Sequence, residues 1–286
     1  SQERKLQKLV SLLKFVAPIS AKFITRIIVG KLRLGFSAMT ILDAFSWAVT
    51  HSKEHRKLLE DAYQKRADVG ELGQVYLELA QQQDDWPKEE DSISEKSHKL
   101  SIENQKIIAE KLTEKYQVQV GIPVIPALCQ RLNTAKEIIE KMGTVIAEPK
   151  YDGLRVQIHY SKKGFEDGTH VRAFTRNLEE VTHMFPELLD IGSVLETDAC
   201  ILDSEAIGYD SQSGELLPFQ STITRKRKHD VAEASQKVPI RFYVFDVLFS
   251  GNASFINKNL HRRKDLLKGL FKENRILIFA DYIVTS

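Results

Sequence analysis

The sequence has few cysteines and no long hydrophobic run. Only Cys129 and Cys200 occur, far apart and without metal-ligand spacing. This excludes a disulfide scaffold and favours a reducing, intracellular compartment. No apolar run approaches the length of about 18 residues that a membrane span needs, and the N-terminus has no signal-peptide pattern. We therefore expect neither a membrane protein nor a secreted one.

The sequence also lacks a strong charge imbalance. Its net charge is only +2, so any basic surface that binds nucleic acid must be local. A composition of 42% hydrophobic and 28% charged residues excludes the disordered and collagen-like classes, and 286 residues suggest two domains. The chain starts at Ser1 and ends at Ser286 just after an apolar run, so we expect truncation at both ends.

The first 117 residues have helical periodicity. Apolar residues recur at the spacing of one helix face around Leu6–Leu13, Ile24–Ile28 and Ile41–Phe45. A charged helix is expected from Ser52 to Lys65, one capped by Asp68 follows, and a last one ends near Tyr116. Residues before proline avoid the helical region, so the two prolines of residues 121–126 predict an extended linker. We predict an all-α domain over residues 1–117 and a linker over 118–126.

Residues 127–286 contain short β-like runs with helical patterns between some of them. The predicted strands are 145–149, 155–160, 170–175, 199–207 and 241–249, and the predicted helices are 134–141, 179–189 and 260–271. Strand clusters with interspersed helices are typical of an α+β domain built on antiparallel sheets. The fold class is therefore multidomain, with a helical domain followed by an α+β domain, both of them partial.

The segment from Glu148 to Arg155, Glu-Pro-Lys-Tyr-Asp-Gly-Leu-Arg, joins two predicted strands. Asp152-Gly153 predicts a tight turn in which glycine supplies unusual backbone angles, and this turn fixes Lys150 at the mouth of a sheet. A lysine amine must lose its proton to act as a nucleophile, which a cationic or metal-bearing pocket favours. An exposed lysine on a hairpin turn is the alternative interpretation.

Lys150-Tyr-Asp-Gly153 resembles the first motif of the covalent nucleotidyltransferases, which are ATP-dependent DNA ligases, RNA ligases and mRNA capping enzymes. Segments that resemble the later motifs follow in order: Phe174–Asn177, Ile201–Ala206 and Tyr243–Asp246. Further segments resemble DNA ligases of the eukaryotic and archaeal type: Gly30–Gly35, Pro218–Gln220 and Thr224–Lys228. The similarity is collinear over nearly the whole chain.

This resemblance implies three contacts with the AMP part of ATP. Lys150 resembles the lysine that attacks the α-phosphorus and becomes attached to AMP. Glu148, two residues earlier and expected on the same strand face, matches the residue that contacts the adenine amino group. Phe245 matches an aromatic residue that stacks on the purine. The alternatives are a solvent-facing Glu148 and a core position for Phe245.

The resemblance also implies contacts with the ribose, the phosphates and a metal. Arg155 and Arg176 match arginines that surround the ribose and phosphates in the family. This role suits arginine, since a guanidinium group can donate two hydrogen bonds to phosphate oxygens. Glu205 matches a residue that contacts the ribose hydroxyl or a metal-bound water. Asp203 shares its strand face, so the two carboxylates could share a cation. Surface ion pairs for the arginines and a structural hydrogen bond for Asp203 are the alternatives.

Two basic segments are candidates for DNA contacts. Lys31 and Arg33 lie between Gly30 and Gly35, where backbone amides could approach phosphates. A second cluster of cations could also contact phosphates. It consists of Arg225, Lys226, Arg227 and Lys228. A helix–helix turn and a solvated loop are the respective alternatives.

The resemblance implies an ATP-dependent DNA ligase that uses Mg²⁺ and seals nicks in duplex DNA during replication, repair and recombination. Its location would be cytoplasmic in a prokaryote and nuclear in a eukaryote, and no protein partner is indicated. The Glu-Gly and Lys-x-Lys motifs of the family and its C-terminal barrel are not found after Phe249, so this fragment alone is expected to be incomplete. The alternatives are a capping enzyme, an RNA ligase, or a nucleic-acid-binding fragment without catalysis.

Overall fold

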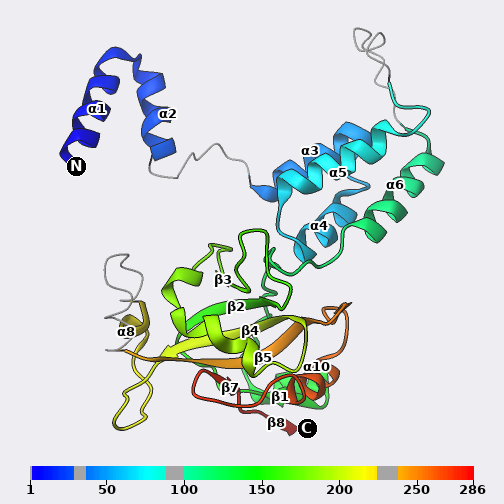
Figure 1. The fold of residues 1–286 in the computed structure, drawn as a ribbon. Coiled ribbons are helices and arrows are strands. Elements are labelled where there is room, and N and C mark those ends of the chain that lie inside the picture. Colours follow the sequence, from blue (N-terminus) through cyan, green and yellow to red (C-terminus); the bar gives the residue numbers. More distant parts are fainter. Residues whose placement is uncertain (1, 29–36, 88–99, 224–237) are drawn as a thin grey trace.

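The computed structural model describes residues 2–28, 37–87, 100–223 and 238–286. It has a helical N-terminal part and an α+β C-terminal part, as predicted (Figure 1). The helices of the first part are α1 (Gln2–Phe15), α2 (Pro18–Ile28), α3 (Ala38–Thr50), α4 (Arg56–Lys65), α5 (Val69–Gln81) and α6 (Ile102–Lys115). Within the described ranges, no helix has both the length and the hydropathy that crossing a bilayer would require.

Helices α3 to α6 share one apolar core, in which Leu42, Tyr76 and Ile108 are fully buried. The predicted cap of α5 is confirmed, because the Asp68 side chain accepts a 2.9 Å hydrogen bond from the amide of Glu71. Helix α6 ends at Lys115, also as predicted. The prediction that a helix begins directly after Ser52 is wrong. The carbonyl of this residue accepts bonds from the hydroxyls of two α3 residues, and α4 begins only at Arg56.

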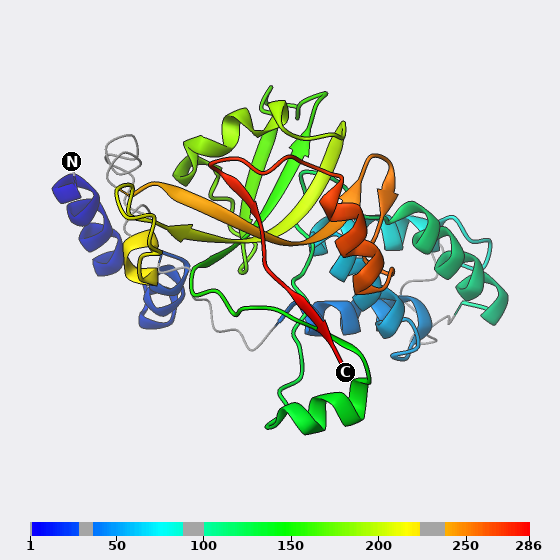
Figure 2. The ribbon, with the colours of Figure 1, turned by 90° about the horizontal axis from the view of Figure 1, so that it is seen from below.

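Helices α1 and α2 lie apart from the α3–α6 bundle in both views (Figures 1 and 2). Their apolar side chains are largely exposed, as the 89% exposure of Phe15 illustrates. No residue of α2 is buried. Their periodicity therefore predicted the helices correctly, but the described chain does not cover the apolar faces.

The α+β part contains a central sheet with the strand order β3-β2-β4-β5-β6, and β7 pairs with β5. A separate two-stranded sheet pairs β1 with β8. The strands are β1 (Val145–Ala147), β2 (Leu154–Ser161), β3 (Val171–Thr175), β4 (Ala199–Gly208), β5 (Ile240–Ser250), β6 (Ala253–Ser254), β7 (Leu277–Phe279) and β8 (Ile283–Thr285). The helical segments are α7 (Ala135–Met142), η2 (Thr182–Met184), η3 (Pro186–Ser193), α8 (Phe219–Ile223) and α10 (Leu260–Lys268).

Alternation along the strands gives the central sheet two different faces. On β2, Val156 and Ile158 point into a core that also contains side chains of β4, β5, η3 and α10. Arg155, Gln157 and His159 occupy the intervening positions and lie on the opposite face. We call this second face the site face, because the predicted site residues of β2, β4 and β5 lie on it.

Three sequence predictions for this part need correction. A helix over residues 179–189 is wrong, since Glu180 forms a bridge with Phe174 and two 3₁₀ segments follow. Pro186 explains this, because Phe185 before it adopts a non-helical backbone with φ −129°. The central sheet is also not purely antiparallel, because β7 runs parallel to β5. Strands β6, β7 and β8 were not predicted.

The segment of residues 118–126, predicted to be extended, contains a turn in which the amide of Ile122 donates to the carbonyl of Gln119 and Gly121 has a φ of 98°. The segment makes hydrogen bonds to both parts of the molecule. On the side of the helices, the amide of Ile125 donates to the carbonyl of Gln64 at 3.0 Å. On the side of the sheet, Val124 donates to Oε1 of Gln157 and accepts from its Nε2, at 2.8 and 2.9 Å. The amide of Gly121 donates to Nδ1 of His159 at 3.0 Å. The linker therefore covers part of the site face next to the predicted site residues.

Candidate active site

The strand register brings predicted site residues into one row. Arg155 of β2 lies opposite Glu205 of β4, and Glu205 lies opposite Tyr243 of β5. Phe245 lies at an irregularity of β5, where the pairing with β4 skips one residue. It is half-buried and its ring centre lies 5.5 Å from the guanidinium carbon of Arg155, whereas its neighbour Val244 belongs to the core. The aromatic ring of Phe245 is therefore available on the site face.

Lys150 is exposed in the loop between β1 and β2. Because β1 pairs with β8, this loop connects two sheets, which excludes the alternative interpretation of a hairpin turn. The expectation of unusual backbone angles at Gly153 is also wrong, since its φ is not positive. Glycine is required there by close packing. An added Cβ would lie 2.4 Å from the carbonyl oxygen of Ala206.

Glu205 anchors the loop that carries Lys150. Its Oε1 accepts a 3.1 Å hydrogen bond from the amide of Gly153. Burial raises the pKa of Glu205, while this bond and the charges of Arg155 and Lys150 act in the opposite direction. The carboxylate therefore lies within electrostatic reach of the predicted nucleophile.

Glu148 lies beyond the end of β1, so it does not share a strand face with Lys150 as expected. Its Oε1 forms an ion pair with Lys264 of α10, which also donates a 2.6 Å hydrogen bond to the carbonyl oxygen of Phe245. Lys264 was not among the predicted site residues. The signal was present, because Leu260, Lys264 and Leu267 share one helix face and place a lysine in an apolar stripe.

Arg155 and Asp203 form a two-bonded ion pair. Nε and Nη2 of Arg155 donate to the two carboxylate oxygens at 3.0 and 2.5 Å, and only 4% of the Asp203 side chain is exposed. This bond raises the pKa of the Arg155 guanidinium, whose carbon also lies 5.5 Å from the centre of the Phe245 ring. Because Asp203 is buried and bonded to Arg155, the geometry favours a structural hydrogen bond for this residue over metal binding. Glu205 remains the candidate metal-binding carboxylate.

The remaining predicted residues are less closely placed. Arg176 is exposed in the turn after β3, one residue beyond the pair Val156–Thr175, and so lies at the same end of the sheet as Arg155. The predicted DNA-binding cations all lie outside the described residues. They are Lys31, Arg33, Arg225, Lys226, Arg227 and Lys228.

Other aromatic and charged contacts close the edge of the site. The rings of Tyr151 and Tyr243 stack with their centres 4.5 Å apart. Arg263 of α10 donates to both carboxylate oxygens of Asp246 at 2.7 and 2.9 Å. These contacts connect the Lys150 loop and helix α10 to strand β5. They could not be predicted before the strand register was known.

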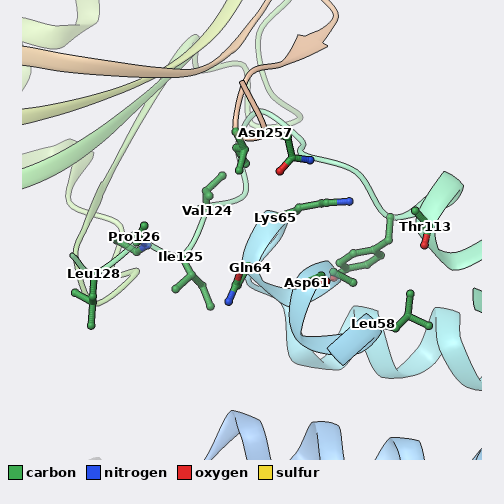
Figure 3. A pocket seen from close by; sticks show the side chains of 14 residues that line it. Leu58, Asp61, Gln64, Lys65, Thr113, Val124, Ile125, Pro126, Leu128 and Asn257 are labelled. Carbon is green, nitrogen blue, oxygen red and sulfur yellow. The ribbon is translucent and has the colours of Figure 1, made fainter. Parts of the chain in front are cut away.

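A cavity of about 690 Å³ lies away from Lys150, between α4, the end of α6 and the linker (Figure 3). Leu58, Val124 and Leu128 are among its lining residues. Lys150, Glu205 and Phe245 are not among the residues that line this cavity. In the described part of the chain, no group of three or more His, Cys, Asp or Glu side chains could hold a metal ion.

The helical part followed by an α+β part, with an exposed lysine loop above an acidic and aromatic sheet face, defines a nucleotidyltransferase-like architecture. Two models of known protein families match this chain. Residues 126–286 match the ATP dependent DNA ligase domain, and residues 1–46 match the DNA ligase N terminus. The chain belongs to the ATP-dependent DNA ligase family, and this family uses ATP.

Curated relatives are similar over nearly the whole chain. DNA ligase 2 of Thermofilum pendens is 35% identical over 274 residues, which cover 96% of this chain and 40% of the relative. The DNA ligase of Caldivirga maquilingensis is 34% identical over 288 residues, which cover all of this chain and 42% of the relative. The chain thus spans about two fifths of the length of these relatives.

A similar solved structure is a mycobacterial DNA ligase D complexed with ATP and MES. It is 22% identical, with a TM-score of 0.36, over 49% of this chain and 40% of that one.

Proposed function

We propose that the protein containing this chain seals nicks in duplex DNA, with ATP as the source of AMP and Lys150 as the nucleophile. The observation that carries this proposal is the hydrogen bond between Gly153 and Glu205, which fixes the Lys150 loop over the site face. The membership of the chain in the ligase family supports it. The roles in replication, repair and recombination and an intracellular location follow from this activity.

In the first step, the amine of Lys150 would attack the α-phosphorus of ATP after losing a proton. A phosphorus–nitrogen bond forms, the bond to the bridging oxygen breaks, and pyrophosphate leaves. AMP would then pass to the 5′-phosphate at the nick, and attack by the 3′-hydroxyl would release AMP and join the strands. The chain's own contribution to the first step is to hold Lys150 and the base in fixed positions.

The nucleotide would lie on the site face. Phe245 offers a half-buried ring for stacking, and Glu148 offers a carboxylate for the adenine amino group. Arg176 is exposed and suits a phosphate, whereas Arg155 is engaged by Asp203 and would act mainly by shaping the site.

For Mg²⁺, the described residues offer a partial fit. Glu205 would hold the ion together with phosphate oxygens, since magnesium is usually bound by one or two carboxylates and substrate phosphates. The ion would neutralise charge on the phosphates.

We also propose that the helical part, residues 1–117, binds duplex DNA and that the linker of residues 118–126 joins it to the adenylation domain, residues 127–286. The separate cores of α3–α6 and of the central sheet support this division. A helical DNA-binding part gives a capping enzyme or an RNA ligase no advantage. A nucleic-acid-binding fragment without catalysis would not need the Lys150 loop.

The test is a nick-sealing assay with the full-length protein. A labelled nicked duplex is incubated with ATP and Mg²⁺, and the joined strand is separated on a denaturing gel. We expect joining by the wild type and none by Lys150→Ala. A wild-type protein that forms no joined strand, or that joins nicked RNA in preference to nicked DNA, would refute the proposed substrate.

A further inference from the structure

Lys264 is a buried cation that the proposed chemistry does not use. Only 3% of it is exposed, although it belongs to the charged sequence His261-Arg-Arg-Lys-Asp265 at the start of α10. Burying an ammonium group costs free energy unless its donors are satisfied. Its partners should therefore explain why it is there.

The three N–H groups of Lys264 have three partners. One donates to Oε1 of Glu148, and a second donates to the carbonyl oxygen of Phe245 at 2.6 Å. The ring of Tyr282 offers its face to the third, with Nζ 5.1 Å from the ring centre. Because an ammonium has three donors and no acceptor, none remains for a bound base.

Glu148 keeps one free acceptor. Its Oε1 is engaged by Lys264, and its Oε2 makes no hydrogen bond with any residue that the structure describes. The same ammonium holds the backbone of Phe245, the candidate stacking residue. The Lys264 ammonium therefore sets the direction of the Glu148 carboxylate and also holds the part of β5 that carries the Phe245 ring.

We infer that Lys264 positions Glu148 so that the Oε2 atom reads the 6-position of the purine, which makes adenylation selective for a 6-amino over a 6-oxo base. This inference rests on the proposed function. An amino group at position 6 can donate to Oε2, whereas a 6-oxo group places a second acceptor against it and leaves the carboxylate unpaired. Lys264 is a positioning residue, because it acts through Glu148 and Phe245.

A series of nucleotides tests the inference in the wild-type full-length protein. The rate of formation of the covalent adduct is measured at low concentrations of ATP, inosine triphosphate and the triphosphate of unsubstituted purine riboside. We expect ATP to react fastest and inosine triphosphate slowest, because only the latter opposes two acceptors. If inosine triphosphate reacts faster than the unsubstituted purine, the ammonium itself contacts the base and the inference is wrong.

Variants of Lys264 separate positioning from a general structural role. In Lys264→Met the ratio of kcat/KM for ATP to that for inosine triphosphate should fall by about tenfold or more. Lys264→Arg should keep the ratio closer to the wild type. Lys268→Met is the matched control, since this exposed lysine approaches the same Tyr282 ring without contacting Glu148, and it should leave the ratio unchanged.

The outcomes are distinct. Equal losses for both nucleotides in Lys264→Met, with the ratio unchanged, would show a merely structural role and overturn the inference. A wild-type protein that forms no adduct with any nucleotide would refute the proposed function, and the inference with it. If thermal unfolding shows that Lys264→Met is not folded, the order of the three nucleotides in the wild type decides.

Discussion

The amide of Gly153 and the carboxylate of Glu205 are joined by a 3.1 Å hydrogen bond between a loop and the central strand β4. The loop carries Lys150, and the strand carries two of the predicted site carboxylates. This bond, together with the close approach of Gly153 to the carbonyl of Ala206, decides where the predicted nucleophile lies.

Gly153→Ala should therefore displace the Lys150 loop. The added Cβ would lie 2.4 Å from a backbone oxygen, and the strand cannot give way easily because β4 is paired on both sides. We expect adduct formation to slow by about tenfold or more, since small displacements of reacting groups are costly. The free energy of unfolding should fall by about 1–3 kcal/mol.

Rates of adduct formation and urea unfolding check this prediction. Gly269→Ala is the control, because its Cβ would meet no atom closer than 3.8 Å and its backbone is right-handed. If Gly153→Ala forms the adduct as fast as Gly269→Ala, the close packing of the loop does not position Lys150.

The buried contact between His159 and the linker predicts a dependence of stability on pH. Burial lowers the pKa of His159 from its ordinary value of 6.5 to about 3. The unfolded chain therefore takes up a proton below pH 6.5, while the folded protein does not. The stability is fully present above pH 6.5 and is lost as the pH falls towards 3, by up to about 1.4 kcal/mol per pH unit.

Between pH 7 and pH 5, His159 should account for a loss of about 2 kcal/mol in the free energy of unfolding. Urea unfolding of wild type and His159→Gln at both pH values measures this, because the variant lacks the titrating group and its stability should change less. His261→Gln, at an exposed position of α10, should behave like the wild type. Equal pH dependence in wild type and His159→Gln would contradict the buried, neutral state of His159.

Much of the fold could be predicted from local sequence signals. The Asp68 cap, the end of α6 and five strands of the α+β part follow from capping, helical spacing and short apolar runs. The 179–189 helix failed because the effect of Pro186 was overlooked. Strands β7 and β8 have three residues each, and their pairing depends on partners far away in the sequence, so no local pattern could reveal them.

The site was harder to predict than the fold. The motifs indicated Lys150, Glu205 and Phe245. The register places Glu205 opposite Arg155, and the guanidinium carbon of Arg155 lies 5.5 Å from the centre of the Phe245 ring, so Glu205 and Phe245 both lie beside Arg155. The Arg155 side chain forms its ion pair with Asp203 and not with Glu205, which lies directly opposite it in the register. Sequence spacing alone cannot decide this, because Arg155 and the two carboxylates come from different strands. Lys264 was missed since a lysine among charged residues is usually exposed, and only its place in the apolar stripe of α10 distinguishes it.

The helical part should bind duplex DNA through phosphates and without base preference, since a nick-sealing enzyme must accept any sequence. Titration of the whole chain against two unrelated duplexes should give similar affinities. Log K should fall with log salt, with a slope near −0.9 for each phosphate contact. Replacing Lys31 and Arg33 with alanine should reduce the slope, while Lys162→Ala in the α+β part should not. A tenfold preference for one duplex, or no salt dependence, would contradict this account.

The central claim is that Lys150 carries the nucleotide. The most direct measurement is tandem mass spectrometry of the protein after incubation with ATP and Mg²⁺, with fragmentation that locates the added mass within the peptide. We predict one AMP on Lys150 in the wild type, and no adduct in Lys150→Arg, which keeps the positive charge but not the nucleophile. AMP on another residue, or an adduct of normal yield in Lys150→Arg, would contradict the account.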